Sequence, residues 1–449
     1  MHIITKIILA LGIPISFAIA QEKSGLNEVL KKKADAFLKQ VKSEDYKERV
    51  QVKKGLEELL ENSGDEKKKL YNYLNQILKE TKDPEIKNTL EDILKFCVLQ
   101  APPLFRIYRN KKYGYIDRTG KVVIKPQFQE ASSFSEGYAI VRYRSGFIMK
   151  YGVINLDGKL VLPYGDAHIK DYSEGLAAYK DLAIGKYGYM NRKFEIAIKP
   201  QFGQAIAFQD RTARVAIDIN GNWHWGIIDR KGNYIIEPKY RQLSKFREGL
   251  ALMTIKMPDG SIKYGFVDKN GKNIIKPSYK KARSFSEGLA AVMEKDRYGY
   301  ISNKEEYIIK PQYKKASVFK ECLAAVQIDD KYGYINIEGD TAIEFKFDYA
   351  DDFINGLAIV RVEGKWGFID TLGKFITKRR YEKVYPFSEN YARIRINGKY
   401  GYISQEGNEI IEPQYENAED FKNGLARVKI DGYYGYINKS GEFVWKPSE

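Results

Sequence analysis

The sequence predicts a mainly β protein made of about ten copies of one small unit, preceded by a small α-helical region. An aromatic residue followed by glycine recurs ten times, and each pair lies among segments that resemble short strands separated by turns. The hydrophobic period changes from helical to strand-like near residue 103. These observations predict a repeat array behind a helical domain.

The aromatic–glycine pairs recur at a nearly constant distance. Their aromatic residues are Tyr113, Tyr151, Tyr187, Trp225, Tyr264, Tyr298, Tyr332, Trp366, Tyr400 and Tyr434. The spacings are 38, 36, 38 and 39 residues, and then 34 residues five times. A period in this range is typical of solenoids, propellers and other repeat arrays.

One unit, "LAIVRVEGKWGFIDTLGKFITK", predicts a three-stranded antiparallel meander. Residues 357–362 are rich in β-branched side chains, and Gly364 supplies a tight turn to a second strand over residues 365–370. A turn that closes on Gly373 leads to a third strand over residues 374–377.

The central strand of the first unit, "YGYI", is apolar on both faces. Tyr113 and Tyr115 share one face, while Gly114 and Ile116 share the other. We therefore expect both faces to be covered, and we expect the glycine to leave room for an aromatic ring from a neighbouring strand. The pair is interpreted as a packing device and not as a ligand site.

The phase of the units favours an open superhelical array. The first unit, residues 104–126, contains all three strands, and the last, residues 425–447, ends just after its third. A closed propeller often divides one blade between its two ends and usually has no more than about eight blades. A closed β-propeller remains the alternative.

Three regions follow along the chain. Residues 1–20 resemble a cleaved signal peptide, with Lys6, an apolar run over residues 7–17 and a small-x-small cleavage site that ends at Ala20. Residues 21–103 form the expected α-helical domain, and residues 104–449 form the β-repeat array. The prediction is an exported protein that is periplasmic, at the cell surface or secreted, with no transmembrane segment after signal removal.

Two sets of acidic residues recur in register and are interpreted as turn or cap residues. The glutamates in the third place of "FSEG"-like turns are Glu136, Glu174, Glu248, Glu287 and Glu389. The aspartates that open the following hairpins are Asp117, Asp229, Asp268 and Asp370. In one copy Glu305 replaces the closing glycine, so we expect that turn to be strained or to change type.

The sequence offers little for catalysis. After the leader the chain has two histidines, His168 and His224, in different repeats, and two cysteines, Cys97 and Cys322. No familiar catalytic, phosphate-binding or zinc-binding motif is present. We expect no enzyme activity, no metal and no cofactor. The cysteines are interpreted as two buried thiols, although export would permit a disulfide between them.

The positive charge lies in the array. Residues 104–449 carry 57 Lys and Arg against 43 Asp and Glu, whereas residues 21–103 carry 17 against 16. Lys125, Lys199, Lys276 and Lys310 occupy one repeat position, which in a regular array would align into a cationic stripe. Glutamates interrupt this position at Glu237, Glu344 and Glu412, so a solvated edge is the other interpretation.

The repeats resemble the WG-repeat family, also called KWG repeats. The resemblance rests on "KWGFIDTLGK" at Lys365, on "WGIIDRKGN" at Trp225 and on the copies with tyrosine in place of tryptophan, and it covers about three quarters of the chain. It implies a β-rich interaction module, mostly of bacteria, without established catalysis. It implies no catalytic residue, and it does not cover residues 1–103.

Two functions remain open. The first is a protein-interaction scaffold, because repeat arrays present long surfaces. The second is a binder of polyanions or glycans at the cell envelope, where acidic polysaccharide or lipid headgroups would be the partners. Export argues against nucleic acid. No binding residue is assigned.

Overall fold

A computed structural model describes residues 28–40, 67–81, 86, 90, 103–377 and 381–446. The chain divides into two compact units, Met1–Ala101 and Pro102–Glu449. The expected signal peptide, Cys97 and most of the expected helical domain lie outside the described residues.

The first unit contains the helices α3 (Glu28–Gln40) and α5 (Lys67–Glu80). In α5 one face is buried, with Leu70, Leu74 and Ile77 spaced as helical periodicity predicts. The Tyr73 hydroxyl donates a 2.7 Å hydrogen bond to Asp35 of α3. None of the described helices is long and apolar enough to cross a membrane.

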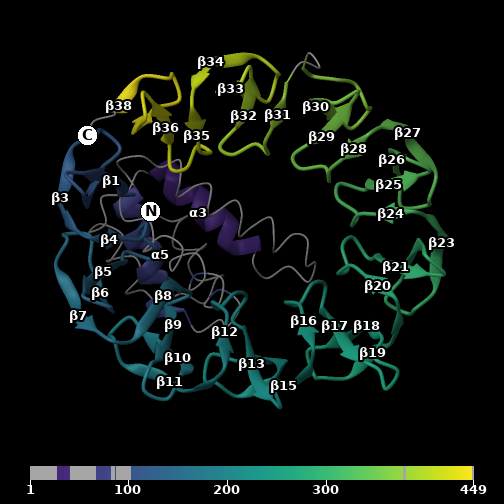
Figure 1. Ribbon diagram of the computed structural model, residues 1–449, viewed down its shortest axis with the longest axis horizontal. Coiled ribbons are helices and arrows are strands. Elements are labelled where there is room, and N and C mark those ends of the chain that lie inside the picture. Colours follow the sequence, from purple (N-terminus) through teal and green to yellow (C-terminus); the bar gives the residue numbers. More distant parts are fainter. Residues whose placement is uncertain are drawn as a thin grey trace, which may run out of the picture. The chain divides into compact units, whose positions relative to one another are not determined.

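The second unit is a closed ring of ten small antiparallel sheets, here called blades 1 to 10 (Figure 1). The strands of blades 1 to 5 are β1 (Phe105–Arg109), β2 (Lys112–Ile116), β3 (Val122–Phe128); β4 (Glu130–Ala131), β5 (Ala139–Ser145), β6 (Ile148–Ile154), β7 (Leu160–Gly165); β8 (His168–Ser173), β9 (Leu176–Asp181), β10 (Lys186–Asn191), β11 (Ile196–Phe202); β12 (Gln204–Ala205), β13 (Ala213–Ile219), β14 (Asn222–Ile228), β15 (Tyr234–Tyr240); β16 (Gln242–Leu243), β17 (Leu250–Lys256), β18 (Ile262–Asp268) and β19 (Asn273–Tyr279).

Blades 6 to 10 continue the same order around the ring. Their strands are β20 (Lys281–Ala282), β21 (Ala290–Glu294), β22 (Arg297–Ile301), β23 (Tyr307–Tyr313); β24 (Lys315–Ala316), β25 (Ala324–Ile328), β26 (Lys331–Ile335), β27 (Thr341–Phe347); β28 (Tyr349–Ala350), β29 (Leu357–Val362), β30 (Lys365–Asp370); β31 (Lys383–Val384), β32 (Tyr391–Ile396), β33 (Lys399–Ser404), β34 (Glu409–Tyr415); β35 (Asn417–Ala418), β36 (Ala426–Ile430), β37 (Tyr433–Ile437) and β38 (Phe443–Trp445).

Most blades have four strands, not the three that the sequence predicts. The additional strand is short, often only two residues, as in Gln204–Ala205, and it comes from the segment that was expected to be a linker. These first strands lie toward the centre of the ring, and the fourth strands lie at its rim (Figure 1). Such a strand was missed because two residues are too few to show a period.

The ring is closed, so the expectation of an open superhelical array is wrong and the propeller alternative holds. Phe105 of β1 packs edge-on against Tyr436 of β37, with ring centroids 5.5 Å apart. The Tyr436 hydroxyl donates to the Arg106 carbonyl at 2.8 Å. Val444 and Trp445 pack on the same cluster. Closure therefore uses side-chain packing between blades 1 and 10, and no blade is divided between the two ends.

Blade 8 departs most from the pattern. Residues 374–377, predicted as the third strand of the meander, form no regular strand; Phe375 and Tyr381 make isolated bridges to β30 instead. The Thr377 hydroxyl accepts a hydrogen bond from the Phe368 amide at 3.2 Å. Like blade 7, blade 8 lacks the proline that the other units have at this step, and the hydrogen bond from the Phe368 amide to Thr377 replaces part of the ladder.

Candidate interaction surfaces

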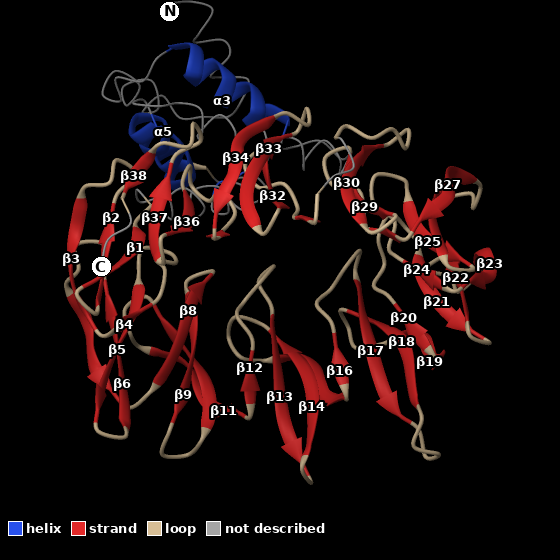
Figure 2. Cartoon of the chain, turned by 45° about the horizontal axis from the view of Figure 1, so that its top comes forward, coloured by secondary structure: helices blue, strands red, loops and turns tan. Residues whose placement is uncertain are grey.

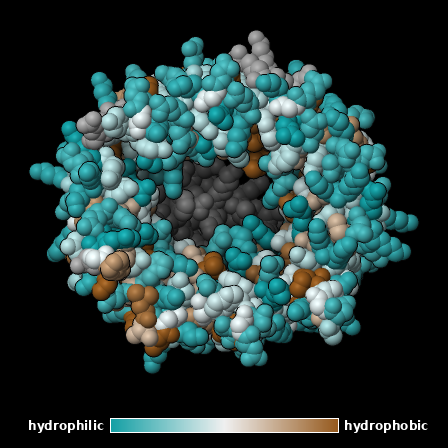
Figure 3. Space-filling model, in the orientation of Figure 1, coloured by the Kyte–Doolittle hydropathy of each residue, from teal (hydrophilic) through white to brown (hydrophobic). Residues whose placement is uncertain are grey.

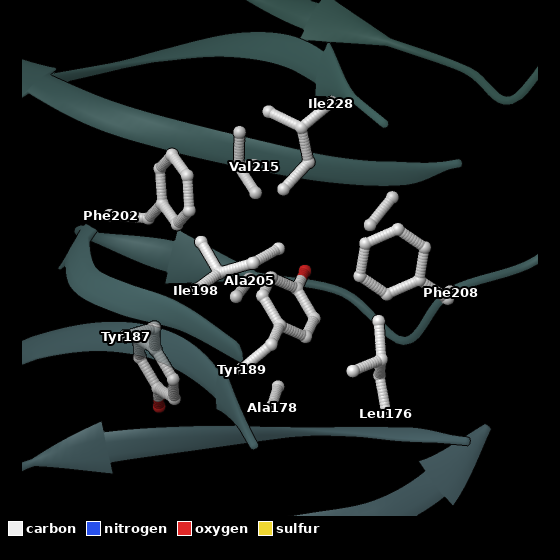
Figure 4. Packing of buried hydrophobic residues seen from close by; sticks show 11 residues of the cluster. Leu176, Ala178, Tyr187, Tyr189, Ile198, Phe202, Ala205, Phe208, Val215 and Ile228 are labelled. Atoms are coloured by element: carbon white, nitrogen blue, oxygen red, sulfur yellow. The ribbon is translucent and has the colours of Figure 1, made fainter. Parts of the chain in front are cut away.

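The joints between blades hold the hydrophobic core. Figure 4 shows the joint of blades 3 and 4, where Tyr189 and Ile198 face Phe208, Val215 and Ile228 of the next blade. The ring of Tyr189 meets Phe208 edge-on at 4.8 Å. The expected double-sided burial of the central strand is confirmed in the first copy, where Tyr115 and Ile116 are both fully buried.

The second tyrosine of each "YGY" motif ties its blade to the next. Tyr115, Tyr189, Tyr300, Tyr334 and Tyr402 each donate to a backbone carbonyl 17 residues later, at 2.6–2.9 Å. Tyr436 makes the corresponding bond to Arg106 and so closes the ring. Burial raises the pKa of Tyr436 to about 12, so its hydroxyl stays protonated as a donor at neutral pH.

The glycine of the motif makes room mainly for backbone, not for an aromatic ring. A Cβ on Gly299 would lie 2.5 Å from the Ile309 carbonyl oxygen and 2.7 Å from the Pro311 nitrogen. A register shift in β22–β23 brings this backbone close. The expected ring lies against the glycine where proline is replaced, as in Phe345, whose ring would meet a Cβ on Gly333 at 3.0 Å.

The "FSEG" glutamates are turn residues, and they also join blades. Glu136 adopts φ 52° in a two-residue turn, where left-handed backbone is required. Its carboxylate accepts the Gly175 amide of the next turn at 2.8 Å and pairs with Arg192 at 2.8 Å. Glu174, Glu248, Glu287 and Glu389 likewise accept amides of the following turn. Sequence reasoning predicted the turn and missed the contact across blades.

The hairpin aspartates are turn residues as well. Asp117 Oδ1 accepts the amides of Thr119 at 2.8 Å and Lys121 at 3.1 Å. Asp229, Asp268 and Asp370 repeat this pattern. The hydrogen bond from the Thr119 side chain holds the pKa of Asp117 below its usual range. Glu305 keeps the same turn with φ 65°, so that copy is strained and does not change type.

Cations stack on the first aromatic residue of most repeats. Arg106 lies 5.2 Å from the ring centre of Tyr113, Arg361 lies 5.4 Å from that of Trp366, and Arg427 lies 3.7 Å from that of Tyr434. Such stacking is favourable where the ring is partly desolvated. Several of the array's Lys and Arg side chains therefore contact aromatic rings within the blades.

The lysines of the "IKP" position lie apart on the rim. Lys125, Lys199, Lys276 and Lys310 are exposed at the centre of the outermost strands, each in a different blade. In a closed ring these positions are distributed around the circumference, and the exposed Glu237, Glu344 and Glu412 share it. The predicted cationic stripe does not form, and the arrangement matches a charged edge that resists strand pairing.

The histidines and the cysteine do not converge on a site. His168 is in blade 3, with its ring 4.9 Å from that of Tyr151, and His224 is in blade 4, with Nδ1 3.0 Å from the Asn222 carbonyl. Burial, with Arg142, Lys170 and Lys180 nearby, lowers the pKa of His168. Cys322 is free and exposed, so its interpretation as a buried thiol is wrong. Within the described residues no three His, Cys, Asp or Glu side chains group as metal ligands would.

Sequence reasoning predicted the hairpins that follow the short first strand of a blade, as at Gly364, but missed that they differ in length around the ring. In blades 6 and 7 the two strands of this hairpin have five residues each, whereas in blades 2 and 4 they have seven. At about 3.3 Å per residue the longer hairpins extend roughly 7 Å further. Figure 2 shows β13–β14 and β17–β18 projecting from the lower edge. The spacings above 34 residues were the available signal.

The long hairpins of blades 2 to 4 carry exposed apolar side chains at their tips. Those more than two fifths exposed there are Phe147, Ile148, Leu182, Ile184, Ile219 and Trp223, and together they are called the tip patch. Figure 3 shows hydrophobic side chains at the lower left, over the blade 2 and 3 region of Figure 1. Nothing lies within 4 Å of a Cβ built at Gly146, Gly185 or Gly221, so these turns are open to solvent, whereas the ring of Trp223 lies against Gly203.

The comparisons with solved structures give only weak likenesses. The tricorn protease matches with TM-score 0.20 and 10% identity over 76% of this chain and 44% of its own. The extracellular domain of a putative hybrid two component system from B. thetaiotaomicron matches with TM-score 0.23 and 10% identity, over 76% of this chain and 56% of its own. A chain of a nidogen/laminin complex matches with TM-score 0.24 and 9% identity, over 46% of this chain and 93% of its own. The chain thus spans about half the length of the first two, and TM-scores this low carry no argument.

The family comparison is decisive where the others are not. No curated protein matches the chain. The family described as "WG containing repeat" matches nine times, over residues 113–145, 151–181, 187–223, 225–255, 264–298, 298–332, 332–366, 366–400 and 400–434. These matches cover well over half of the chain, and each begins at one of the aromatic–glycine pairs that organise the blades. The chain therefore belongs to the WG-repeat family.

Proposed function

We propose that the protein is a non-enzymatic interaction scaffold whose ring presents its hairpins to a protein partner. The observation that carries the proposal is the contrast between the two ends of the blades. At the turn end, repeated polar groups such as Glu136 and Asp117 bond within the ring. At the hairpin end the side chains differ from blade to blade and face solvent, as at Lys295 and Asp329. A surface of that kind suits a specific partner.

A role without catalysis has support from the same contacts. The repeated carboxylates have structural partners, and the two histidines lie in different blades without a neighbouring nucleophile among their described contacts. A general base needs a position within hydrogen-bond reach of its substrate and a partner that orients it. Neither histidine has such a setting in the described part of the chain.

The alternative of a polyanion or glycan binder has weaker support. Its predicted feature was a continuous row of lysines, and the rim instead alternates Lys199 with Glu237 and Lys310 with Glu344. Alternating signs do not attract a polyanion along the whole circumference. Export remains part of the proposal and rests on residues 1–20 alone. The N-terminal sequence of protein recovered outside the cytoplasm tests it, with Gln21 expected as the first residue.

The scaffold proposal is tested by capture from detergent-solubilised envelope proteins of the source cell, at low and high salt. We expect one protein to remain bound at high salt. That protein, once purified, should bind the full chain with a defined stoichiometry in calorimetry. Capture that vanishes with salt and contains polysaccharide in place of protein would contradict the scaffold and support the alternative. No capture under either condition would contradict both.

A further inference from the structure

We infer that the tip patch is a contact surface for a lipid bilayer that contains anionic headgroups. The inference goes beyond the proposed scaffold, because it concerns three particular hairpins and a different class of partner. It rests on where the apolar side chains lie, on what surrounds them and on how the tips differ from those of the other blades.

The apolar side chains protrude from the ring and do not line a hollow. Phe147 has a relative exposure of 108%, next to Ile148 at 58%, and the neighbouring tip exposes Leu182 at 51% and Ile184 at 57%. Trp223 extends the patch to the third tip with 42% exposure: one side of its ring lies against Gly203, and the rest faces solvent. A protein partner would need a separate pocket for each tip, whereas a bilayer accepts any number of side chains that reach one plane. Aromatic and aliphatic residues of this kind enter the boundary between headgroups and acyl chains.

The three tips are able to reach one plane. The strands of every blade follow one another in chain order, so the hairpins that contain Gly146, Gly185 and Gly221 project from the same end of the ring. Blades 2 to 4 are consecutive, and their hairpins are longer than those of blades 6 and 7. The shorter hairpins end in polar turns such as Lys295–Asp296 and Asp329–Asp330, which would stay in water.

Positive charge lies just behind the tips of blades 2 and 3, whereas the tip of blade 4, residues 216–226, has no Lys or Arg. Arg144 and Lys150 are each three residues from Phe147, and Lys180 and Lys186 are each two residues from Leu182 or Ile184. At about 3.3 Å per residue these cations lie roughly 7–10 Å behind the apolar side chains. That is the depth of the headgroup layer when apolar side chains enter the boundary. Each cation near an anionic surface favours binding.

The acidic residues in this region are few. Asp181 and Asp218 lie close to the tips, Glu130 pairs with Arg142 of β5 at 3.2 Å, and Asp259 lies in the neighbouring hairpin loop of blade 5. Asp181 Oδ1 already accepts the amides of Ala183 at 2.9 Å and Ile184 at 3.3 Å, so it shapes the loop that presents Leu182 and Ile184. The balance of charge around the patch remains positive, which complements an anionic bilayer.

The test is co-sedimentation of the full chain with vesicles of phosphatidylcholine alone and of phosphatidylcholine with phosphatidylglycerol. We expect binding to the mixed vesicles that weakens in high salt. The double variant Phe147→Ser, Ile148→Ser should lower the partition coefficient roughly tenfold or more, because two large side chains no longer enter the bilayer. The matched control is Leu372→Ser: Leu372 is 87% exposed on a turn at the opposite end of its blade, and its loss should leave binding unchanged.

A second readout is the fluorescence of Trp223, which reports on the tip alone. It is needed because the apolar residues 1–20, if still attached, would bind lipid themselves. Trp223 emission should shift to shorter wavelength on addition of mixed vesicles. Trp223→Phe should abolish the shift, and Trp366→Phe should keep it. Equal binding by the tip variant and the Leu372 control, an unchanged shift in Trp223→Phe, or no vesicle binding would each overturn the inference.

The lipid test fails separately from the scaffold test. Capture of a protein in detergent does not depend on a bilayer, so a chain that ignores vesicles can still be a scaffold. If the double variant loses a protein partner while wild type ignores vesicles, the tip patch is a protein surface and the lipid inference is wrong. Circular dichroism and the melting temperature of each variant show whether its fold is intact.

Discussion

The two ends of the blades differ in how much they repeat. At the turn end, the Asp117-type and Glu136-type turns recur with the same backbone and the same bonds to the next blade. At the hairpin end, strand length, loop length and side-chain type all change around the ring. Residues that repeat in register hold the ring together. Residues that break the register are the ones left for a partner.

The largest effect on stability is expected from replacing a glycine of the repeated aromatic–glycine motif. Gly299→Ala places a Cβ 2.5 Å from the Ile309 carbonyl oxygen, where bulged backbone cannot easily move. We expect a loss of about 3 kcal/mol in the free energy of unfolding. The control is Gly165→Ala, where a Cβ has nothing within 4 Å, and it should stay within about 0.5 kcal/mol. If both variants lost the same free energy of unfolding in chemical denaturation, the close backbone approach at Gly299 would not be the cause of the loss.

A second test uses alkaline pH at the closing joint. Because burial raises the pKa of Tyr436 to about 12, its hydroxyl contributes stability that is complete below the unfolded pKa of about 10. That contribution falls as pH rises from about 10 through 12. The stability advantage of wild type over Tyr436→Phe should therefore shrink by up to about 1.4 kcal/mol per pH unit in this window. A constant difference from pH 8 to 12 would contradict the assignment.

A third test removes one carboxylate that joins two turns. Glu136→Ala deprives the Gly175 amide of its acceptor and Arg192 of its partner, and the Glu136 side chain is only 9% exposed. We expect a loss of about 2 kcal/mol, as for hydrogen bonds to charged groups. Glu338→Ala, in an exposed position of another turn, should change stability by less than about 0.5 kcal/mol. The denaturant midpoints of both variants measure these changes, and equal midpoints would contradict a role for Glu136 in joining the blades.

The smallest expected effect comes from a single hydroxyl between blades. Tyr300→Phe removes the 2.9 Å bond to the Ser317 carbonyl and keeps the ring in place. We expect a loss of about 1 kcal/mol. Tyr143→Phe at an exposed hairpin position serves as control and should be neutral. If the control costs as much as the buried variant, the hydroxyl bonds are not what joins the blades.

The sequence predicted each unit better than it predicted their assembly. Strand, turn and strand follow from residues that lie close together, such as Gly364 and Gly373, so the meanders and their number could be read directly. Closure depends on a small rotation at every joint and on contacts such as Tyr436 with Arg106, which are 330 positions apart. No single unit contains that information. The absence of a divided blade suggested an open array, but side-chain packing closes this ring without one.

The candidate surface was hidden for a related reason. A repeat pattern reveals residues that recur, and the residues of the tip patch do not recur. Phe147 and Leu182 have no counterpart in blades 6 and 7, and the only trace in the sequence is the excess length of the first units. Lysines that recur, such as Lys125 and Lys199, drew attention but lie separately on the rim.

Closure without a shared strand makes the joint of blades 1 and 10 equivalent in kind to every other joint. A phenolic hydroxyl reaching a neighbouring carbonyl and an edge-on aromatic pair hold it, as in the joint of blades 3 and 4. The point where the chain starts is then arbitrary for the ring. Circular permutation, with residues 104 and 446 linked and new ends opened between Lys295 and Asp296, should leave the same architecture. In evolution, such a ring can change its circumference by duplication or loss of whole units of the gene.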